Sequence, residues 1–534
     1  MYKHFILCTI AIFTILPVLA QTNTFQKTYG GPGDEEAYSV QQTSDGGYIL
    51  AGYTKSYGPG NFENAYLIRT DSMGDLVWSK TYGVSGGASK FRSVLPTSDG
   101  GFIAAGWIYE SPAKAHDILI VKTDGAGNEM WTRKFGGAGC DSAFSINLDD
   151  DGGYLISGST SVSVADYPVP FILKINNTGT VILFKSYDLT AFRGVGSFRT
   201  SDGGLFLLGS FPSTVAPFLF SLNNSGSYEW TKSFYIHNGS AGSPSNHVDP
   251  PSCAIIQTND SGYLYCGPGS AWGGADIGLF KLDDTGGVVW AKAYGNTLDE
   301  YGYSISKTND GGFIVAGLSY SFSLGDRDFY LFKVDSLGNV QWSRGYGGSG
   351  EDFLYSMSNT DDGGFVLAGS SFSYGNGKQI YLVKTDVDGL SGCNDKNAIT
   401  KESSGTINSG DGLLWPIQTL SNDSSAIITI TSETESDSTH CSSLSVEKIA
   451  ERRELKVYPN PAHSHINLEL DRTDIEFIEV SLSDQTGRVV ATLFKEAYNA
   501  YTGQLSLPEV APGLYLLTVR TDDQKPRQFK LIIQ

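Results

Sequence analysis

The chain has 534 residues, more than one hydrophobic core usually organises, so at least two domains are expected. Glycine, tyrosine and phenylalanine are abundant (64, 29 and 28 residues) and methionine is scarce, a composition typical of short strands joined by tight turns. The formal net charge of −20 argues against a protein that binds nucleic acid or anionic membranes, because such a field repels phosphate groups.

Residues 1–20 have the pattern of a secretory signal peptide. Lys3 and His4 precede a short apolar run, and cleavage after Ala20 leaves Gln21 as the first mature residue. The run is too short for a membrane span, and no later segment approaches one. The residue directly after the cleavage site is not a cysteine. We therefore expect an exported protein with a mature charge of −21, no transmembrane segment and no lipoprotein anchor.

Five cysteines remain after the signal peptide is removed, so at least one cannot be in an intramolecular disulfide. Cys253 and Cys266 flank one expected hairpin, and Cys393 and Cys441 bracket the segment that follows the repeats described below. In an oxidising compartment we predict pairing within each couple, which leaves Cys140 as a thiol. The alternative is that all five cysteines are reduced and buried.

A turn of the type Thr-x-Asp-Gly-Gly, followed by an apolar run, occurs seven times between Phe25 and Gly389, at intervals of 50 to 58 residues. Each repeat is expected to form four strands, because Gly and Asp favour the tight turns that separate its apolar segments. The second strand is apolar on both faces, which is typical of a strand between neighbouring sheets. The turn aspartates are Asp45, Asp99, Asp151, Asp202, Asp260, Asp310 and Asp362.

A tryptophan near the start of the fourth strand recurs in five repeats. Its fixed position predicts packing between sheets in preference to stacking on carbohydrate. The residues are Trp78, Trp131, Trp230, Trp290 and Trp342, and Phe184 takes this place in the third repeat.

The seventh repeat ends at Gly389 without a fourth strand. Residues 25–31 have the same pattern as residues 342–348, so an N-terminal strand is expected to complete the last unit and close a ring. The sequence therefore predicts a seven-bladed β-propeller over residues 21–392. An open solenoid, the alternative, leaves the N-terminal strand unexplained. The repeats resemble the Asp-Gly-Gly propeller-like repeats common in exported proteins of the Bacteroidota phylum.

Residues 393–452 are rich in serine, threonine and acidic residues, which is typical of a linker. Two apolar stretches, 413–417 and 426–430, are expected to form a small β-appendage held by Cys393 and Cys441.

Residues 453–534 contain short apolar segments at the spacing of a small β-sandwich, so an all-β chain is predicted throughout. The expected strands are 455–458, 465–470, 478–483, 488–494, 514–520 and 529–533.

This C-terminal segment resembles the type A sorting domain of type IX secretion substrates, with motif residues Tyr458, Pro459, Asn460, Pro461, Gly487, Gly513 and Tyr515. The resemblance implies the type IX secretion machinery as a partner and export across the outer membrane of a Gram-negative bacterium. It also implies removal of the domain, followed by release of the protein or its attachment to the cell surface. An unrelated immunoglobulin-like sandwich is the alternative.

Acidic residues recur between the fourth strand of one repeat and the first strand of the next. In a propeller these loops emerge on one face, where they either form a cation or cationic-ligand site or satisfy loop amides; the second interpretation is favoured. The members of this acidic ring are Asp34, Glu35, Glu36, Asp141, Asp299, Glu300, Glu351 and Asp352.

Asn147, Asp149 and Asp151 mimic the start of a calcium loop, but Gly158 stands where the bidentate acid is expected. Zinc spacings are absent from the sequence, so no cofactor or metal is predicted, and calcium is the one cation considered.

The longest loop between strands, 237–251, accounts for the 58-residue interval. A long loop on a rigid ring is a common place for a ligand site, so His237, His247 and Asp249 are candidate ligand-binding residues, with loop drift as the alternative.

No catalytic constellation is evident in the sequence. We therefore expect a secreted or cell-surface binding or adhesion module for an unknown glycan or protein ligand, and no catalytic residue is assigned. A secreted glycan-acting hydrolase or lyase is the alternative; it would need convergent carboxylates, or a Tyr/His/Arg group, at one mouth of the ring.

Overall fold

The computed structural model divides the chain into two compact units, Met1–Val446 and Glu447–Gln534. All elements in the described residues are strands. The predicted signal peptide lies outside those residues. The structure describes residues 23–533 except 61, 111–114, 138, 162–167, 188–192, 202, 211–217, 238–253, 273, 324, 394, 405, 412–415, 418–421, 424–428, 434–435, 440–454, 459–464, 471–477, 484–487, 497–500, 509, 512 and 522–526.

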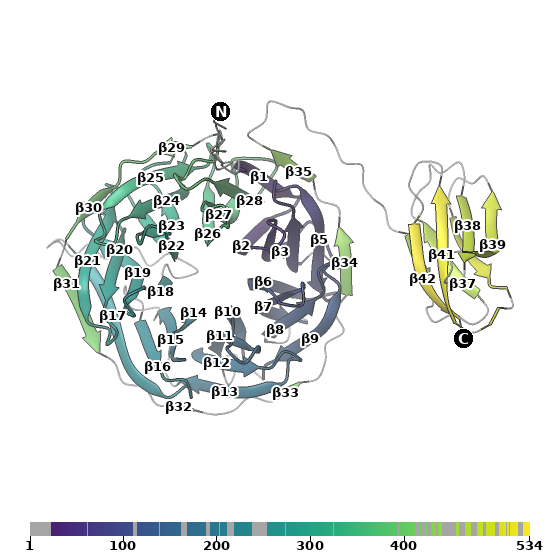
Figure 1. Ribbon diagram of the computed structural model, residues 1–534, viewed down its shortest axis with the longest axis horizontal. Coiled ribbons are helices and arrows are strands. Elements are labelled where there is room, and N and C mark those ends of the chain that lie inside the picture. The colour runs from purple at the N-terminus through teal and green to yellow at the C-terminus, as the bar shows by residue number, and fades with distance from the viewer. Residues whose placement is uncertain are drawn as a thin grey trace, which may run out of the picture. The chain divides into compact units, whose positions relative to one another are not determined.

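The first unit is a propeller-like ring of antiparallel sheets (Figure 1). Each sequence repeat contributes strands in order from the central opening to the periphery, so β2, β6, β10, β14, β18, β22 and β26 lie innermost. A short parallel pairing between the fourth strand of repeat four and the second strand of repeat five joins those two sheets. The strands, repeat by repeat, are β2 (Glu35–Gln42), β3 (Tyr48–Thr54), β4 (Asn64–Thr70), β5 (Leu76–Gly83); β6 (Ala88–Pro96), β7 (Phe102–Tyr109), β8 (Asp117–Thr123), β9 (Glu129–Phe135); β10 (Ser142–Leu148), β11 (Tyr154–Thr160), β12 (Val169–Ile175), β13 (Val181–Tyr187); β14 (Arg193–Arg199), β15 (Leu205–Ser210), β16 (Phe218–Leu222), β17 (Tyr228–His237); β18 (Ala254–Gln257), β19 (Tyr263–Ser270), β20 (Asp276–Leu282), β21 (Val288–Gly295); β22 (Glu300–Lys307), β23 (Phe313–Ser319), β24 (Asp328–Val334), β25 (Val340–Tyr346); β26 (Asp352–Asn359), β27 (Phe365–Ser371) and β28 (Gln379–Thr385).

The N-terminal strand β1 (Phe25–Gly30) is the fourth strand of the last sheet. It pairs antiparallel with β28, and Phe25 lies opposite Lys384. The predicted contribution of this strand to the seventh repeat is therefore confirmed. The pairing joins the two ends of the repeat region, so the last sheet has a fourth strand like the other sheets.

The segment predicted as a linker instead follows the outside of the ring as a belt, residues 396–439. Each of its short strands pairs antiparallel with the fourth strand of one sheet, in the reverse of the chain order (Figure 1). The predicted β-appendage is therefore wrong, because the short strands of this segment pair with the free edges of the outer strands of the ring. The pairs are β29 (Lys396–Asn397) on β25, β30 (Lys401–Ser403) on β21, β31 (Thr406–Asp411) on β17, β32 (Pro416–Ile417) on β13, β33 (Asn422–Asp423) on β9, β34 (Thr429–Glu433) on β5 and β35 (Ser436–Thr439) on β1.

The second unit contains two antiparallel sheets. Buried Val480, Leu482, Leu517 and Val519 alternate along two neighbouring strands of the larger sheet, as the period of a strand requires. The smaller sheet contains β36 (Leu455–Tyr458), β37 (His465–Leu470) and β40 (Tyr501–Ser506); the larger contains β38 (Ile478–Ser483), β39 (Val489–Glu496), β41 (Gly513–Thr521) and β42 (Arg527–Ile533). The six expected strands are present, and β40 is an additional one.

Adjacent sheets of the ring are joined by one recurring contact. Tyr294 in β21 donates a hydrogen bond of 2.7 Å to the carbonyl of Gly338 in the next repeat, and Trp290 packs against the same glycine. Gly338 has φ +77°, a backbone conformation that glycine adopts without steric cost. The same tyrosine bond links Tyr29 to Gly74, Tyr82 to Gly127, Tyr187 to Gly226 and Tyr346 to Gly389.

We expect Gly338→Ala to destabilise the ring more than Gly311→Ala. Both glycines have positive φ, so both substitutions carry about 1–2 kcal/mol of backbone strain. A Cβ on Gly338 would lie 2.7 Å from the Tyr294 hydroxyl and 3.0 Å from Trp290, whereas a Cβ on Gly311 meets nothing within 4 Å. The clash should add about 1–3 kcal/mol to the loss of unfolding free energy, measured by denaturant titration of the full chain. Equal losses would contradict this account of the contact.

The belt yields a second prediction, for which Ile407→Pro in β31 is the test. Ile407 lies opposite Ile236 of β17, and proline cannot donate a ladder hydrogen bond. Hydrogen exchange measured by mass spectrometry should show faster exchange over residues 232–237 in this variant. Ile399→Pro is the matched control, because Ile399 is 79% exposed and lies between β29 and β30. Unchanged protection in the Ile407 variant would mean that the belt does not pair stably with β17.

Candidate functional site

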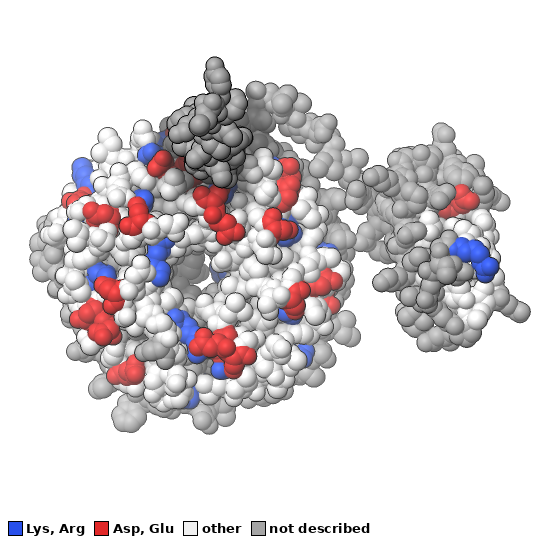
Figure 2. Space-filling model, viewed as in Figure 1, with Lys and Arg blue, Asp and Glu red and all other residues white. Residues whose placement is uncertain are grey.

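The Asp-Gly-Gly turns are held by a recurring ion pair. Asp310 accepts hydrogen bonds from the Thr308 hydroxyl and the Gly312 amide, and Lys333 from the neighbouring strand lies 2.6 Å from its carboxylate. The hydrogen bonds from Lys333 and Thr308 lower the pKa of Asp310 to about 2. Figure 2 shows acidic and basic side chains next to each other around the ring, which has an opening at its centre. Equivalent pairs are Arg69–Asp45, Lys122–Asp99, Lys174–Asp151, Lys281–Asp260 and Lys384–Asp362.

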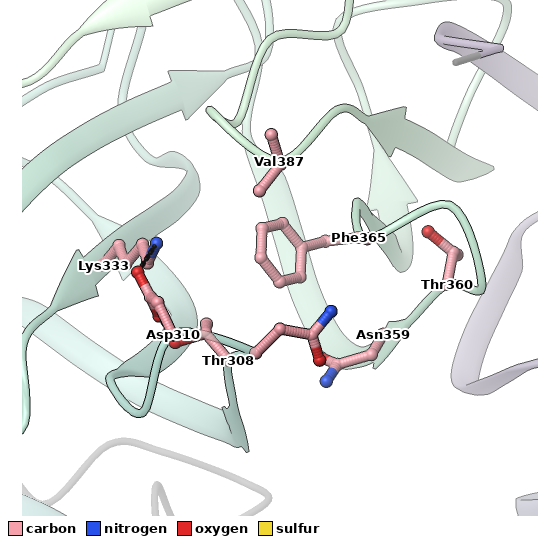
Figure 3. A pocket seen from close by; sticks show the side chains of 9 residues that line it. Thr308, Asp310, Lys333, Asn359, Thr360, Phe365 and Val387 are labelled. Carbon is pink, nitrogen blue, oxygen red and sulfur yellow. Dashed lines mark hydrogen bonds and ion pairs between the residues drawn. The ribbon is translucent and has the colours of Figure 1, made fainter. Parts of the chain in front are cut away.

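A cavity of about 150 Å³ lies between two of these turns, in repeats six and seven (Figure 3). Phe365 and Val387 form its apolar wall, and the Asp310–Lys333 pair lies at one side. The charged groups here already neutralise each other within the turn. The cavity therefore presents no unpaired charge to a ligand, and it is explained as a crevice between neighbouring sheets.

The predicted calcium loop is occupied by protein cations. Lys174 and Arg199 both contact the Asp149 carboxylate, and Lys174 lies 2.9 Å from Asp151. Asn147 donates a hydrogen bond to the Ser197 carbonyl at 3.1 Å. Among the described residues, no group of three or more acidic, histidine or cysteine side chains is arranged to hold a metal.

Four members of the acidic ring lie in the predicted loops (Asp34, Asp141, Asp299 and Glu351), whereas Glu35, Glu36, Glu300 and Asp352 lie in the first residues of the innermost strands. In four repeats, one carboxylate at an equivalent position is buried and accepts hydrogen bonds from a hydroxyl group and a backbone amide. Glu300 accepts from the Ser319 hydroxyl (2.7 Å) and the Asn296 amide (2.8 Å), and thereby ties the loop to β23. Glu35, Asp141 and Asp352 occupy the same position in their repeats. The other members also have partners: Asp34 with Lys55, Glu36 with Lys378, Asp299 with the Ala275 amide, and Glu351 with Arg327. These contacts support satisfaction of loop groups over capture of a cation.

Three junctions between repeats bring two carboxylates together around a glycine, and all of these carboxylates except the partly exposed Asp117 are buried. At Gly295, an added Cβ would collide with both Asp276 and Glu300. Burial, together with the charge of Glu300, raises the pKa of Asp276 to about 7 against backbone hydrogen bonds that lower it. Asp141, opposite Asp117 at Gly136, has a pKa raised by burial to about 6. Asp328 and Asp352 meet in the same way at Gly347.

We expect Asp276→Asn to raise the stability of the protein at pH 8. The pKa of Asp276 is higher in the folded than in the unfolded chain, so its contribution is present below about pH 4 and is lost as the pH rises through 7. The asparagine removes this loss, which is at most roughly 4 kcal/mol for a shift of this size. Thermal unfolding between pH 4 and 8 measures the effect. The pKa of Asp310 is lowered in the folded protein, so Asp310→Asn should instead destabilise the protein at neutral pH. If the unfolding temperature of Asp276→Asn depends on pH as it does in the wild type, the raised pKa of Asp276 is contradicted.

Several other predicted site residues lie wholly or partly outside the described part of the chain. His237 ends β17, where its backbone lies opposite Ser270 and Thr406, and His247 and Asp249 are outside the described residues. The ligand role of these three residues stays a prediction.

The cysteines give a mixed result. Cys266 carries a thiol in β19, and Ala254, not Cys253, is the residue directly opposite it, so the predicted Cys253–Cys266 bridge is not formed. Cys140 is a free thiol. Cys393 is disulfide-bonded, whereas Cys441 lies outside the described residues, so the pairing of these two stays a prediction.

A different group of side chains gathers on the innermost strands. Six of these strands contain a β-bulge at the same position, which leaves one residue without a cross-strand partner. Bulges re-aim a side chain and often lie beside functional sites. The bulged residues are Tyr38, Arg92, Phe144, Val195, Tyr303 and Tyr355.

Four of these residues form a continuous group, which we call the axial cluster: Tyr38, Arg92, Tyr303 and Tyr355. The Arg92 guanidinium carbon lies 4.1 Å from the centre of the Tyr38 ring. The Tyr38 and Tyr355 rings are 5.1 Å apart, and the Tyr355 and Tyr303 rings are 6.3 Å apart. All four side chains are partly exposed. The axial cluster thus extends across four consecutive repeats that face the central opening.

Further cations and aromatic rings border the axial cluster. Arg327 lies 3.9 Å above the Phe353 ring and pairs with Glu351, and Lys90 lies 3.9 Å above the Tyr53 ring. Burial raises the pKa of Tyr38, Tyr303 and Tyr355 above the ordinary tyrosine value. These phenols therefore stay neutral at physiological pH and offer flat apolar faces with hydroxyl donors and acceptors.

Glu36 anchors the border of the axial cluster. Burial opposes its ionisation, but Lys378, together with hydrogen bonds from Lys378 and Tyr38, holds its pKa below the ordinary value. Glu36 is thus a charged partner for Lys378 and Tyr38, and it is not a proton acceptor poised near neutral pH.

The sequence reasoning missed the axial cluster, although a signal was present. An aromatic residue or arginine directly precedes a serine in the first strand of five repeats. Four of the serines bond across to the next sheet; Ser39, for example, accepts from the Val94 amide at 3.2 Å. These dipeptides begin at Tyr38, Arg92, Phe144, Tyr303 and Tyr355.

The C-terminal unit matches a known family. Residues 456–534 match the model of the secretion system C-terminal sorting domain. The chain therefore carries a type IX sorting tail, which indicates export to the cell surface or the extracellular space. Of the predicted motif, Tyr458 ends β36, Gly513 begins β41, and the Tyr515 hydroxyl donates to the Ala511 carbonyl at 2.7 Å. Pro459, Asn460, Pro461 and Gly487 lie outside the described residues.

Several solved structures with low sequence identity match the chain. The chain is similar to a protein of unknown function from Dyadobacter fermentans (11% identity, TM-score 0.37, 68% of this chain and 98% of that one). Puromycin hydrolase (13% identity, TM-score 0.39, 64% and 50%) and prolyl oligopeptidase B from Galerina marginata (9% identity, TM-score 0.38, 94% and 57%) also match. The chain spans only about half the length of these last two proteins, and no activity is inferred from them.

No curated protein matches the chain. Within the described ranges, no helix has the length and apolar character needed to cross a membrane.

Proposed function

We propose that the first unit is a seven-bladed β-propeller that acts as a non-catalytic binding or adhesion module. The support for seven blades is the set of six repeats with four strands each and a seventh with three strands, which β1 completes. The two sheets of the C-terminal unit are proposed to form a small β-sandwich, the sorting domain, that engages the type IX secretion machinery. The mature protein then acts at the outer surface of a Gram-negative bacterium or after release from it.

The single observation that carries the binding function is the axial cluster. Three tyrosines and an arginine, partly exposed on consecutive bulges, form a surface that is both flat and polar at its edges. Tyrosine gives large contact area at low conformational-entropy cost, which is why binding surfaces are rich in it. Sugars present an apolar ring face together with hydroxyl groups, so a glycan is the ligand that suits this surface best, with a protein ligand as the second choice.

A glycan-acting hydrolase or lyase is the alternative function. Such an enzyme needs a side chain that accepts or donates a proton near neutral pH. The raised pKa of Tyr38 and Tyr355 and the ion pair between Glu36 and Lys378 give the axial cluster no such group among the described residues. The arrangement of charges therefore favours binding over catalysis.

The test is binding of the mature full chain to a glycan and polysaccharide array, with and without calcium, followed over time. The double substitution Tyr38→Ala/Tyr355→Ala should weaken binding by about tenfold, because each aromatic contact contributes roughly 0.5–1.5 kcal/mol. Phe62→Ala is the control, because Phe62 is 38% exposed and lies outside the axial cluster.

Wild-type affinity in the double variant would contradict the assignment of the site. No signal on any glycan would contradict a carbohydrate ligand and direct the search to a protein partner. Loss of arrayed glycan with time would favour the enzyme.

A further inference from the structure

The charges around the axial cluster are not all balanced. Lys90 lies 3.1 Å from Glu63, Arg327 lies 3.1 Å from Glu351, and Lys378 pairs with Glu36. Arg92 differs from these cations. Its Nε is buried without a hydrogen-bond partner, and the guanidinium makes no ion pair with any residue that the structure describes. Its guanidinium lies instead over the face of the Tyr38 ring.

Arg92 therefore has no anionic partner among the described residues. A buried guanidinium nitrogen without a hydrogen-bond partner is costly, and the donors of a guanidinium match the two oxygens of a carboxylate in a bidentate pair. The guanidinium of Arg92 lies over the face of the Tyr38 ring, and the Tyr355 ring follows 5.1 Å from the Tyr38 ring. A ligand that satisfies all three side chains has a carboxylate joined directly to a compact ring with apolar faces.

We infer that the axial cluster recognises an acidic sugar residue, with its carboxylate on Arg92 and its ring against Tyr38 and Tyr355. The inference rests on the proposed function and names the ligand class of the same site. A uronic acid has this combination of a carboxylate and a pyranose ring, whereas a neutral hexose leaves Arg92 without an anion.

The rest of the protein limits the ligand further. The mature chain carries a net charge of −21, and a field of that sign repels a densely charged polymer at long range. A single carboxylate needs only the local positive charge of Arg92, and screening over about 8 Å at physiological salt hides much of the remaining field. The preferred ligand is therefore a glycan with isolated uronic acids between neutral sugars, not a continuous polyuronate.

Calorimetric titration of the mature full chain tests this at 0.15 M salt. The probes are an oligosaccharide with one glucuronic acid between neutral sugars, the same oligosaccharide with its carboxyl group reduced to an alcohol, and a polyuronate of equal length. We expect the acidic oligosaccharide to bind at least tenfold more tightly than its reduced form and more tightly than the polyuronate.

Substitutions at Arg92 complete the test. Arg92→Gln should remove the tenfold preference for the acidic glycan over its reduced form, while Arg92→Lys should retain part of that preference. Arg344→Gln is the matched control, because Arg344 also has a buried Nε without a partner and lies 5.5 Å over an aromatic ring, Trp342, on the outer strand β25. Thermal unfolding of each variant verifies that it is folded.

The outcomes separate the two proposals. Equal affinity for the acidic and reduced glycans, or a preference that survives in Arg92→Gln, overturns the acidic-sugar inference and leaves glycan binding intact. Tightest binding to the polyuronate overturns the preference for isolated acids. If the protein binds none of the probes and no arrayed glycan, both the inference and the proposed glycan ligand are overturned.

Discussion

The ring depends on one interaction, the contact of a tyrosine and a tryptophan in the outer strand of one repeat with a glycine in the next. The glycine supplies a positive φ and the absence of a side chain, and its carbonyl accepts the tyrosine hydroxyl inside the hydrophobic layer between sheets. The same contact joins the two ends of the repeat region, since Tyr29 of β1 reaches Gly74. Closure of the ring therefore needs no special interface; it reuses the tyrosine–glycine bond that is found at four other junctions between sheets.

The two edges of each sheet have different roles. The outer edge is covered by the belt, so the strands that would otherwise expose unpaired backbone groups are paired within the chain. The inner edge is interrupted by a bulge that turns one side chain out of the regular alternation. Rigidity at the periphery thus supports variation at the centre: the bulged position holds tyrosine, arginine, phenylalanine or valine, while the serine that follows it in five repeats stays the same.

The parts of the fold that carry a local signal could be predicted from the sequence. The seven turns, the four strands of each repeat and the closing strand β1 repeat a pattern that the chain itself displays. The belt could not be predicted, because strands of two residues such as Pro416–Ile417 and Asn422–Asp423 have no periodicity and exist only where an outer strand offers an edge. The acidic ring shows the limit of an argument from spacing: it predicted equivalent positions for Glu35 and Glu300, but it could not show that a hydroxyl group of the neighbouring strand already donates a hydrogen bond to each carboxylate. The axial cluster was missed because a bulge breaks the alternation on which strand prediction relies.

The route of the belt also sets an order of assembly. The belt visits the sheets backwards, from the sixth repeat to the first, and its last strand, β35, ends on β1, which is therefore held between β28 and β35. In a chain that emerges from its N-terminus, β1 appears first but receives its second neighbour only when Thr439 has followed. The first strand of the sorting domain, β36, begins at Leu455, sixteen residues after Thr439. The last strand of the belt and the sorting domain are thus synthesised one shortly after the other. A chain that ends before the sorting domain has therefore only just completed the strand pairing of its ring.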